Sequence, residues 1–424
     1  MKKLFLSLLL LMHGFVSAAI FQVNLTVQDH VDDNPGDGVC DIPSGGFCTL
    51  RAAVMEANAL PGADIIVLPG NSNVRLSING AGENAAATGD LDITSPVVIG
   101  TFVEPTEDFP TIDASLLNDR IFHVLSGSGA VTFVNVRMVN GSADFSNGGA
   151  INISTANQVQ VDRVWFEDNT ADSGGAIYIS PLSELTVIDS VFKGNAAVTQ
   201  GAALTIFGTT DIDKATIYEN LNFNGGFKEA VYVGFDQFGT SYLTLRNSTV
   251  FNNSNSGIYG FGGDVSIRNS TIALNSERGI ISNPDGKQNP ELRIRNSVFN
   301  QNGVTDCAAG GTVDVIADNW NIASDNSSCF QLGTTNLVET DPKLTVIKTD
   351  SENWHSYFRP GFYSPIVDSA HPTTPGPGIG CEAEDQRGVA RAQDGNHDGT
   401  ARCDRGAIEL LEDVIFYDDF DIAY

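Results

Sequence analysis

The sequence is poor in basic residues. Among its 424 residues, 23 Lys and Arg stand against 52 Asp and Glu, which gives a formal net charge of −29. So acidic a chain is repelled by nucleic acid and by anionic membrane surfaces, which excludes both as expected partners and favours bound cations. Beyond the first 18 residues no apolar run approaches the length of a transmembrane helix, so none is expected.

Catalytic signatures of common hydrolases are missing. The sequence has no GxSxG elbow and no HExxH motif. It also lacks the clustered Asp pair with Gly-His-Gly that β-helix pectin hydrolases carry. No CxxC pair occurs and histidine is scarce, which excludes a zinc ribbon. An even number of cysteines in an exported chain instead predicts three local disulfides, Cys40–Cys48, Cys307–Cys329 and Cys381–Cys403.

The first 18 residues have the pattern of a secretory signal. Lys2 and Lys3 precede the apolar run LFLSLLLLMHGFV, and Val16-Ser17-Ala18 supplies small residues for cleavage. Removal of this leader takes two positive charges with it, so the mature chain carries −31 rather than −29. The sequence therefore predicts an exported protein.

A repeat occupies the middle of the chain. Between Val131 and Asn302 one phrase recurs seven times, with the form apolar-x-apolar-x-(Asn/Asp)-small-x-apolar-x-x-Asn. The apolar residues alternate as in a half-buried strand, and a second alternating strand, such as GGAIYIS from Gly174, lies between phrases. Steps of 22 to 33 residues between phrase ends fit one coil of short strands. The closing residues are Gly141, Asn169, Asn195, Asn220, Asn253, Asn275 and Asn302.

These features predict an all-β fold, a single right-handed parallel β-helix of roughly ten coils in which the closing asparagines form a hydrogen-bonded ladder. The predicted organisation is a signal peptide at 1–18, an N-terminal cap with a short helix at 19–62, the β-helix at 63–340, a closing segment at 341–409 and an acidic, aromatic tail at 410–424. The tail is either an edge strand or a sorting signal. The 33-residue step between Asn220 and Asn253 predicts a loop thrown out from one corner.

One column of side chains carries charge on the predicted outer surface. Arg246, Arg268 and Arg295 precede the Asn/Asp position in three consecutive phrases. Three roles are open to these arginines. They form a surface ladder paired with Asp213 and neighbouring acids, or they bind an acidic glycan. In the third, they supply the neutralising or proton-accepting base of a polysaccharide lyase. Trp165, one position before an apolar core position, is the candidate platform for stacking a sugar.

Calcium is the one cofactor that the sequence suggests. Asp394, Asn396 and Asp398 have the oxygen-ligand spacing of a calcium loop, although Arg405 stands where the full loop needs Glu. The alternative is a polar turn closed by Cys381–Cys403. An acidic turn between Asp29 and Asp41 is likewise a calcium site or a solvated loop.

The segment Cys48-Thr49-Leu50-Arg51-Ala52-Ala53 resembles the Cys-Ser-Leu-Arg-Glu-Ala (CSLREA) domain of bacterial surface proteins, with Thr49 in place of Ser and Ala52 in place of Glu. The repeats are similar to those of right-handed β-helix, polymorphic outer-membrane and adhesin-like proteins. The segments SPIVDSA, DQRG and CDRGAIE are similar to the closing part of choice-of-anchor proteins. This resemblance implies an exported bacterial protein and supplies no catalytic residue.

The expected function is therefore that of a secreted or cell-surface, adhesin-like monomer that binds polysaccharide or cell-surface glycans without catalysis. A lyase acting on acidic polysaccharide is the first alternative, and a structural component of the envelope or matrix is the second.

Overall fold

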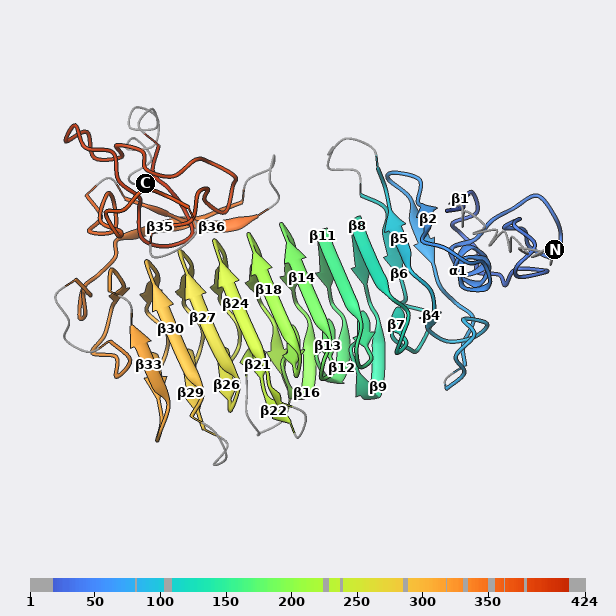
Figure 1. Ribbon diagram of the computed structural model, residues 1–424, viewed down its shortest axis with the longest axis horizontal. Helices are drawn as coiled ribbons and strands as arrows, with labels where there is room; N and C mark the ends of the chain where they lie inside the picture. Colours follow the sequence, from blue (N-terminus) through green and yellow to red (C-terminus); the bar gives the residue numbers. More distant parts are fainter. Residues whose placement is uncertain are drawn as a thin grey trace, which may run out of the picture.

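The computed structural model describes residues 18–80, 82–102, 109–223, 229–236, 239–284, 289–317, 319–330, 335–349, 355–361, 363–376 and 380–411. This part of the chain winds into a right-handed parallel β-helix, which confirms the fold class that the repeat predicts. Figure 1 shows the strands stacked along the long axis, with the only helix of the described residues at the N-terminal end. Almost all of the proposed signal peptide and tail lies outside the described residues.

In the repeat, the residues at the start of each phrase form the first face of the β-helix. Its strands pair in parallel with their neighbours one coil away. They are β1 (Ile20–Gln22), β2 (Asp64–Val67), β5 (Val97–Gly100), β8 (Ala130–Val139), β11 (Gln158–Glu167), β14 (Glu184–Ile188), β18 (Thr209–Asp213), β24 (Tyr242–Arg246), β27 (Asp264–Arg268), β30 (Glu291–Arg295) and β33 (Asp314–Ala317).

The second face follows after a sharp bend. Strands β8 and β11 run through both faces, and a residue with positive φ, Asn135 or Arg163, marks the bend in each. The other strands of this face are β3 (Asn73–Arg75), β6 (Thr111–Asp113), β15 (Val191–Lys193), β19 (Thr216–Tyr218), β25 (Thr249–Phe251), β28 (Thr271–Ala273), β31 (Val298–Asn300) and β34 (Ile322–Ala323).

The third face is a nine-stranded parallel sheet, and a short four-stranded sheet leads into it. The nine strands are β4 (Leu91–Ile93), β7 (Phe122–Val124), β10 (Ile151–Ile153), β13 (Ile177–Ile179), β17 (Leu204–Ile206), β21 (Glu229–Val233), β26 (Ser256–Phe261), β29 (Arg278–Asn283) and β32 (Thr305–Ala309). The four are β9 (Ser142–Asn147), β12 (Thr170–Ser173), β16 (Ala196–Gln200) and β20 (Leu221–Asn222). An antiparallel hairpin of β22 (Phe235–Asp236) and β23 (Gly239–Thr240) lies where the repeat predicts an inserted loop.

Apolar side chains from the three faces meet inside the coil. Phe166 is fully buried and its ring stacks on that of Phe192 one coil away, at 4.8 Å between centroids. The sequence GGA closes the corner before β13 for steric reasons. Gly174 has a φ of +66°, and a Cβ on Gly175 would lie 2.1 Å from the carbonyl oxygen of Ala202.

The predicted asparagine ladder is present and buried at the corner after the second face. The side-chain amide of Asn169 donates to Oδ1 of Asn195 at 3.0 Å, and the same contact repeats at 3.1, 2.9, 2.8 and 2.9 Å through to Asn302. Asn302 then donates to Asp306 Oδ1 at 2.8 Å. Each amide thus satisfies polar groups that would otherwise be buried without partners.

Helix α1 (Leu50–Ala59) covers the N-terminal end of the core, as predicted. Its N-cap is Thr49, whose side chain accepts from the Ala52 amide, and the face with Leu50 and Val54 is buried. At the opposite end, Phe330 packs on Phe299 with 5.4 Å between ring centroids, beside the Cys307–Cys329 disulfide. All three predicted disulfides are present.

The segment after residue 340 differs from the prediction that it closes the far end of the β-helix. It forms a hairpin of β35 (Leu344–Thr349) and β36 (Ser356–Pro360), and continues to residue 411 with little regular structure. Figure 1 shows that it lies along the side of the coils, over the half that contains β24, β27 and β30. The Gln386 side chain and the Ala407 amide of this segment bond to Thr249 and Thr271, so the segment packs on the second face rather than over the open end.

Candidate functional site

The C-terminal segment packs on one half of the second face, which includes β19 and β25. The other half includes the strands β8, β11 and β15. On the covered half, Gln386 is fully buried, donates to the Ala215 carbonyl and to Thr216 Oγ1, and accepts from Thr249 Oγ1 at 2.6 Å. Phe358 packs edge-on against Phe251. The outward side chains of β19 and β25 therefore pack against the C-terminal segment. The outward side chains of β8, β11 and β15 lie in the other half.

Trp165 lies in that other half, half-buried on β11 and in register with Arg137 on β8. Alternation explains its direction, because Val164 and Phe166 on either side point into the core. The guanidinium of Arg137 lies 5.1 Å from the centre of the indole ring, which is the geometry of a cation–π contact. An aromatic ring is therefore held in one orientation on the surface.

A carboxylate beside the ring joins two cations. Glu167 accepts from Arg137 Nη2 at 2.5 Å and from Lys193 Nζ at 2.9 Å. The side chains of Arg137 and Lys193 are 40% and 34% exposed, whereas that of Glu167 is 17% exposed. We call Arg137, Trp165, Glu167 and Lys193 the Trp165 platform. It combines one partly buried aromatic ring, with a guanidinium over the ring, and two further charged hydrogen-bonding groups.

Protonation on this platform is fixed by the same contacts. The hydrogen bond that Lys193 donates to Glu167 raises the pKa of the Lys193 ammonium, against the opposing effect of burial. Burial favours the neutral form of Glu167, but its bonds to Lys193 and Arg137 outweigh this and lower its pKa. Both groups therefore stay charged near neutral pH, and Lys193 is a poor proton acceptor.

The arginine column lies at the bend between the first and second faces, next to the C-terminal segment. Arg246 makes a bidentate pair with Asp211 at 3.0 Å, and its Nη1 lies 3.8 Å from Glu382. The Nη1 atom of Arg268 lies 4.0 Å from the same Glu382. Arg295 is buried, 4% exposed. Burial disfavours the charged form of Arg246, but Asp213, Asp211 and Glu382 together raise the pKa of its guanidinium.

The asparagine that follows each of these arginines has a role that the sequence did not reveal. Asn247 accepts from Arg391 at 3.1 Å, Asn269 accepts from the Glu382 amide at 3.1 Å, and Asn296 accepts from the His371 amide at 3.0 Å. The RNS phrase therefore supplies a row of acceptors on which the C-terminal segment docks.

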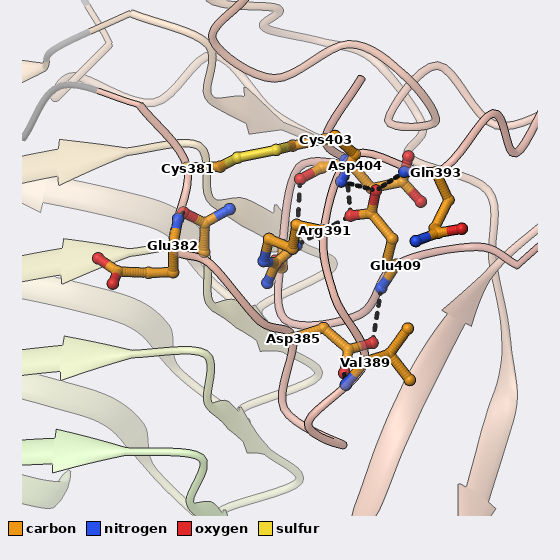
Figure 2. A network of polar contacts seen from close by, with 12 residues as sticks. Cys381, Glu382, Asp385, Val389, Arg391, Gln393, Cys403, Asp404 and Glu409 are labelled. Carbon is orange, nitrogen blue, oxygen red and sulfur yellow. Dashed lines mark hydrogen bonds and ion pairs between the residues drawn. A yellow bond between two sulfur atoms is a disulfide. The ribbon is translucent and has the colours of Figure 1, made fainter. Parts of the chain in front are cut away.

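The motifs CDRGAIE and DQRG build a buried network within that segment (Figure 2). Arg391 is 5% exposed, donates to Glu409 at 3.3 Å, and also donates to the carbonyls of Gly406 and Ala407. Burial and the neighbouring Glu409 raise the pKa of the Asp404 carboxyl well above its ordinary value. These charged residues thus hold the segment together beside the Cys381–Cys403 disulfide, and their contacts account for the motif.

In the predicted calcium loop, the side-chain oxygens point at the loop's own backbone. Asp394 accepts from the amides of Asp398 and Gly399, and Asn396 Oδ1 also accepts from Asp398. At the twelfth position Arg405 turns away and donates to the carbonyls of Ser369 and Asn321. Calcium binding by Asp394, Asn396 and Asp398 stays a prediction.

The acidic turn between Asp29 and Asp41 is organised by the helix rather than by solvent alone. Asp29 pairs with the buried Arg51, and Glu56 accepts from the amides of Gly36 and Gly38. Arg51 also donates to the carbonyls of the loop before β4. This explains physically why an arginine stands in the CSLREA-like segment.

The third face carries a second polar cluster, which was not predicted from the sequence. Asp90 and Asp92 lie either side of the core residue Leu91, so both point outward from the third face. His123, in register with Asp92 on the next coil, brings its Nδ1 within 3.4 Å of Asp92 Oδ1. Burial, with the neighbouring Asp119, raises the pKa of Asp90 to about 7. The pattern Asp-Leu-Asp was visible in the sequence, but its register with His123 was not.

Aromatic rings continue along the third face beyond this cluster. Phe207 lies 5.8 Å from Tyr178 and 6.0 Å from Tyr232, and Tyr259 follows at 5.9 Å. Tyr232 and Tyr259 are only 6% and 2% exposed. These two rings pack on their neighbours and present little surface, so the third face is a weaker candidate for sugar stacking than the Trp165 platform.

The fold and the platform define a class, a disulfide-stabilised parallel β-helix with an ordered aromatic and charged surface patch. No family model matches the chain, and no curated protein matches it. Among solved structures the chain is similar to the crystal structure of pectate lyase Pel9A, with 13% sequence identity and a TM-score of 0.47 over 93% of this chain and 97% of that one. A likeness this weak carries no activity from that enzyme to this chain.

Proposed function

We propose that this protein is a non-catalytic, adhesin-like glycan-binding protein that acts outside the cytoplasm, and that the Trp165 platform is its binding surface. The observation that carries this proposal is the Arg137–Trp165 contact with Glu167 and Lys193 beside it. Sugar rings stack their apolar faces on aromatic side chains, and charged groups at the edge of the ring bind the hydroxyl or carboxylate groups.

The location follows from redox chemistry. Three disulfides tie the cap, the last coils and the C-terminal segment. Such bonds persist in oxidising compartments and are rare in the cytosol. No helix in the described part of the chain is long and apolar enough to cross a membrane. An exported or surface-displayed protein accounts for the disulfides.

The charges disfavour the lyase alternative. A lyase needs a basic side chain that can give up its proton and take one from the sugar. Lys193 and Arg246 both have raised pKa values because carboxylates contact them. Neither is poised as a base. Arg268, the other candidate, lies beside Glu382 at the edge of the C-terminal segment.

A panel of polysaccharides tests this proposal. Purified protein is applied to neutral polymers, pectin, alginate and sulfated glycans, and two quantities are read: retention on the polymer and the ultraviolet absorbance of newly formed unsaturated ends. Retention on at least one polymer without new absorbance supports glycan binding. Turnover that disappears in Arg268→Ala would contradict it and favour the lyase. Neither retention nor turnover would favour a structural role in the envelope.

A further inference from the structure

We propose that Asp90, Asp92 and His123 form a binding site for one divalent transition-metal ion, with Zn²⁺ as the probe. The site lies on the third face, away from the Trp165 platform, and is independent of the proposed glycan binding. One ligand atom from each of the three residues lies within 4.8 Å of the other two. Two carboxylates and an imidazole are a donor set that zinc and related ions accept.

Asp92 gives the independent reason for a ligand. Its side chain is 0% exposed, and its Oδ1 has no hydrogen-bond partner within the described residues, while its Oδ2 accepts from the Ala86 amide at 3.3 Å. A buried carboxylate oxygen without a donor is costly. His123 Nδ1 lies 3.4 Å from this oxygen. This separation is long for a hydrogen bond, but it suits two ligands of one tetrahedral ion with bonds of about 2 Å.

Outer contacts already orient each ligand. Asp90 Oδ2 accepts from Arg120 Nη1 at 2.9 Å, and the other ring nitrogen of His123, Nε2, lies 2.9 Å from Ser154 Oγ. A metal-bound histidine ordinarily donates its second ring N–H to such a partner. In the tautomer whose Nε2 donates to Ser154, Nδ1 carries the lone pair and lies next to Asp92. The arrangement is that of a site whose supporting contacts are complete.

The local charge also favours a dication. Three carboxylates, Asp90, Asp92 and Asp119, lie close together, and one guanidinium, that of Arg120, faces them. Acidic side chains therefore outnumber basic ones in this largely buried place, and a divalent ion would offset their charge. The amide oxygen of Asn152, in register with His123 on the next coil, is also buried without a partner among the described residues.

The imidazole of His123 determines which class of metal ion the site prefers. Calcium prefers six to eight oxygen ligands, so this cluster discriminates against it, in contrast to the oxygen-rich loop at Asp394. With three protein ligands the ion keeps an open position. His123 is 18% exposed, so solvent reaches the edge of the site. The inferred site is therefore open and takes a borderline ion in preference to calcium.

Isothermal titration of metal-stripped full-length mature protein with ZnCl₂ and with CaCl₂ tests the inference. We expect one Zn²⁺ per chain, weaker or no binding of Ca²⁺ to this site, and a loss of Zn²⁺ affinity of roughly tenfold or more in His123→Gln. The control is His397→Gln, which removes an exposed histidine from the loop at Asp394 and should leave Zn²⁺ binding unchanged.

A second measurement covers the case in which a variant does not fold. Wild-type protein titrated with Co²⁺ should develop visible d–d absorption bands of an ordered site, and Zn²⁺ should abolish them at one equivalent. Absence of Zn²⁺ binding by the wild type, equal affinity in His123→Gln, or loss of binding in His397→Gln alone would each overturn the inference.

Discussion

Arg51 and Asp29 form a fully buried ion pair that joins the N-terminal helix to the acidic turn before it. Nε of Arg51 lies 2.8 Å from Oδ1 of Asp29, and Nη2 lies 3.1 Å from Oδ2. Arg51 further donates to the carbonyls of Ala86 and Gly89. The cap therefore depends on one guanidinium whose donors reach both Asp29 and the loop before β4.

Replacing Arg51 by alanine should destabilise the cap by about 3–5 kcal/mol, because it leaves the carboxylate of Asp29 buried without its cation. The free energy of unfolding from urea titration gives the measurement. The exposed Arg75 supplies the control, since Arg75→Ala should change stability by less than about 0.5 kcal/mol. Equal effects of the two substitutions would contradict the role given to the buried pair.

The asparagine ladder leads to a second prediction. Asn220 donates to Asn253 Oδ1 and to the Phe192 carbonyl, and accepts from the side chain of Asn195. Asn220→Ala removes these bonds and leaves buried polar groups unpaired, so stability should fall by about 2–4 kcal/mol. Thermal and urea unfolding measure the loss. Asn73→Ala, at an exposed position outside the ladder, should have no comparable effect, and a ladder variant as stable as this control would refute the explanation.

The ladder and the fold could be predicted because they follow from local patterns. Stacking identical coils forces the residue at the end of each phrase, such as Asn195 and Asn220, into contact with its copy, so the period alone gives the neighbours. The disulfides could be predicted for a similar reason, since each joins cysteines close in sequence.

Contacts between distant segments could not be predicted in this way. Glu382 meets Arg246, and Gln386 meets Thr216, because the C-terminal segment turns back along the coils, and no periodicity encodes that path. Trp165 could be proposed from alternation, and its partner Arg137 holds the same place in the preceding phrase, so the period places the two residues side by side. The Asp92–His123 contact differs, because it lies in the irregular first coils, where no repeated phrase sets the register.

The C-terminal segment should depend on Arg391, the residue that contacts both the network of Figure 2 and Asn247 on the β-helix. Arg391→Ala leaves Glu409 buried without its cation and removes the bond to Asn247, so the segment should detach more readily. Limited proteolysis followed by mass spectrometry should show faster cleavage after residue 340. Arg402→Ala, at an exposed position, is the control. Equal cleavage rates in the two variants would show that Arg391 does not hold the segment.

Glu229 gives a pH dependence. Its carboxyl is 1% exposed, and burial, with a smaller contribution from Glu277, raises its pKa from 4.5 to about 8. The folded protein therefore keeps this proton between pH 4.5 and 8, where the unfolded chain has released it. The contribution of Glu229 to the free energy of unfolding is fully present below pH 4.5. It falls by about 1.4 kcal/mol per pH unit as the pH rises from 4.5 to 8.

Glu229→Gln removes this titration. The variant should be similar to the wild type in stability at pH 4.5 and more stable than it at pH 8.5, as measured by urea unfolding at both pH values. The Gly201 amide that donates to Glu229 can donate to the glutamine oxygen in the same way. A difference between the two proteins that is independent of pH would contradict the assignment.

The most direct test of the central claim is the affinity for an oligosaccharide prepared from whichever polymer retains the protein, measured by isothermal titration. Trp165→Ala should weaken binding by roughly tenfold or more, as expected for an aromatic residue at the centre of a binding surface. Tyr242→Ala, which removes a ring that is 48% exposed on the first face, should leave the affinity unchanged. Unchanged affinity in Trp165→Ala, in a variant that unfolds at the same urea concentration as the wild type, would contradict the account.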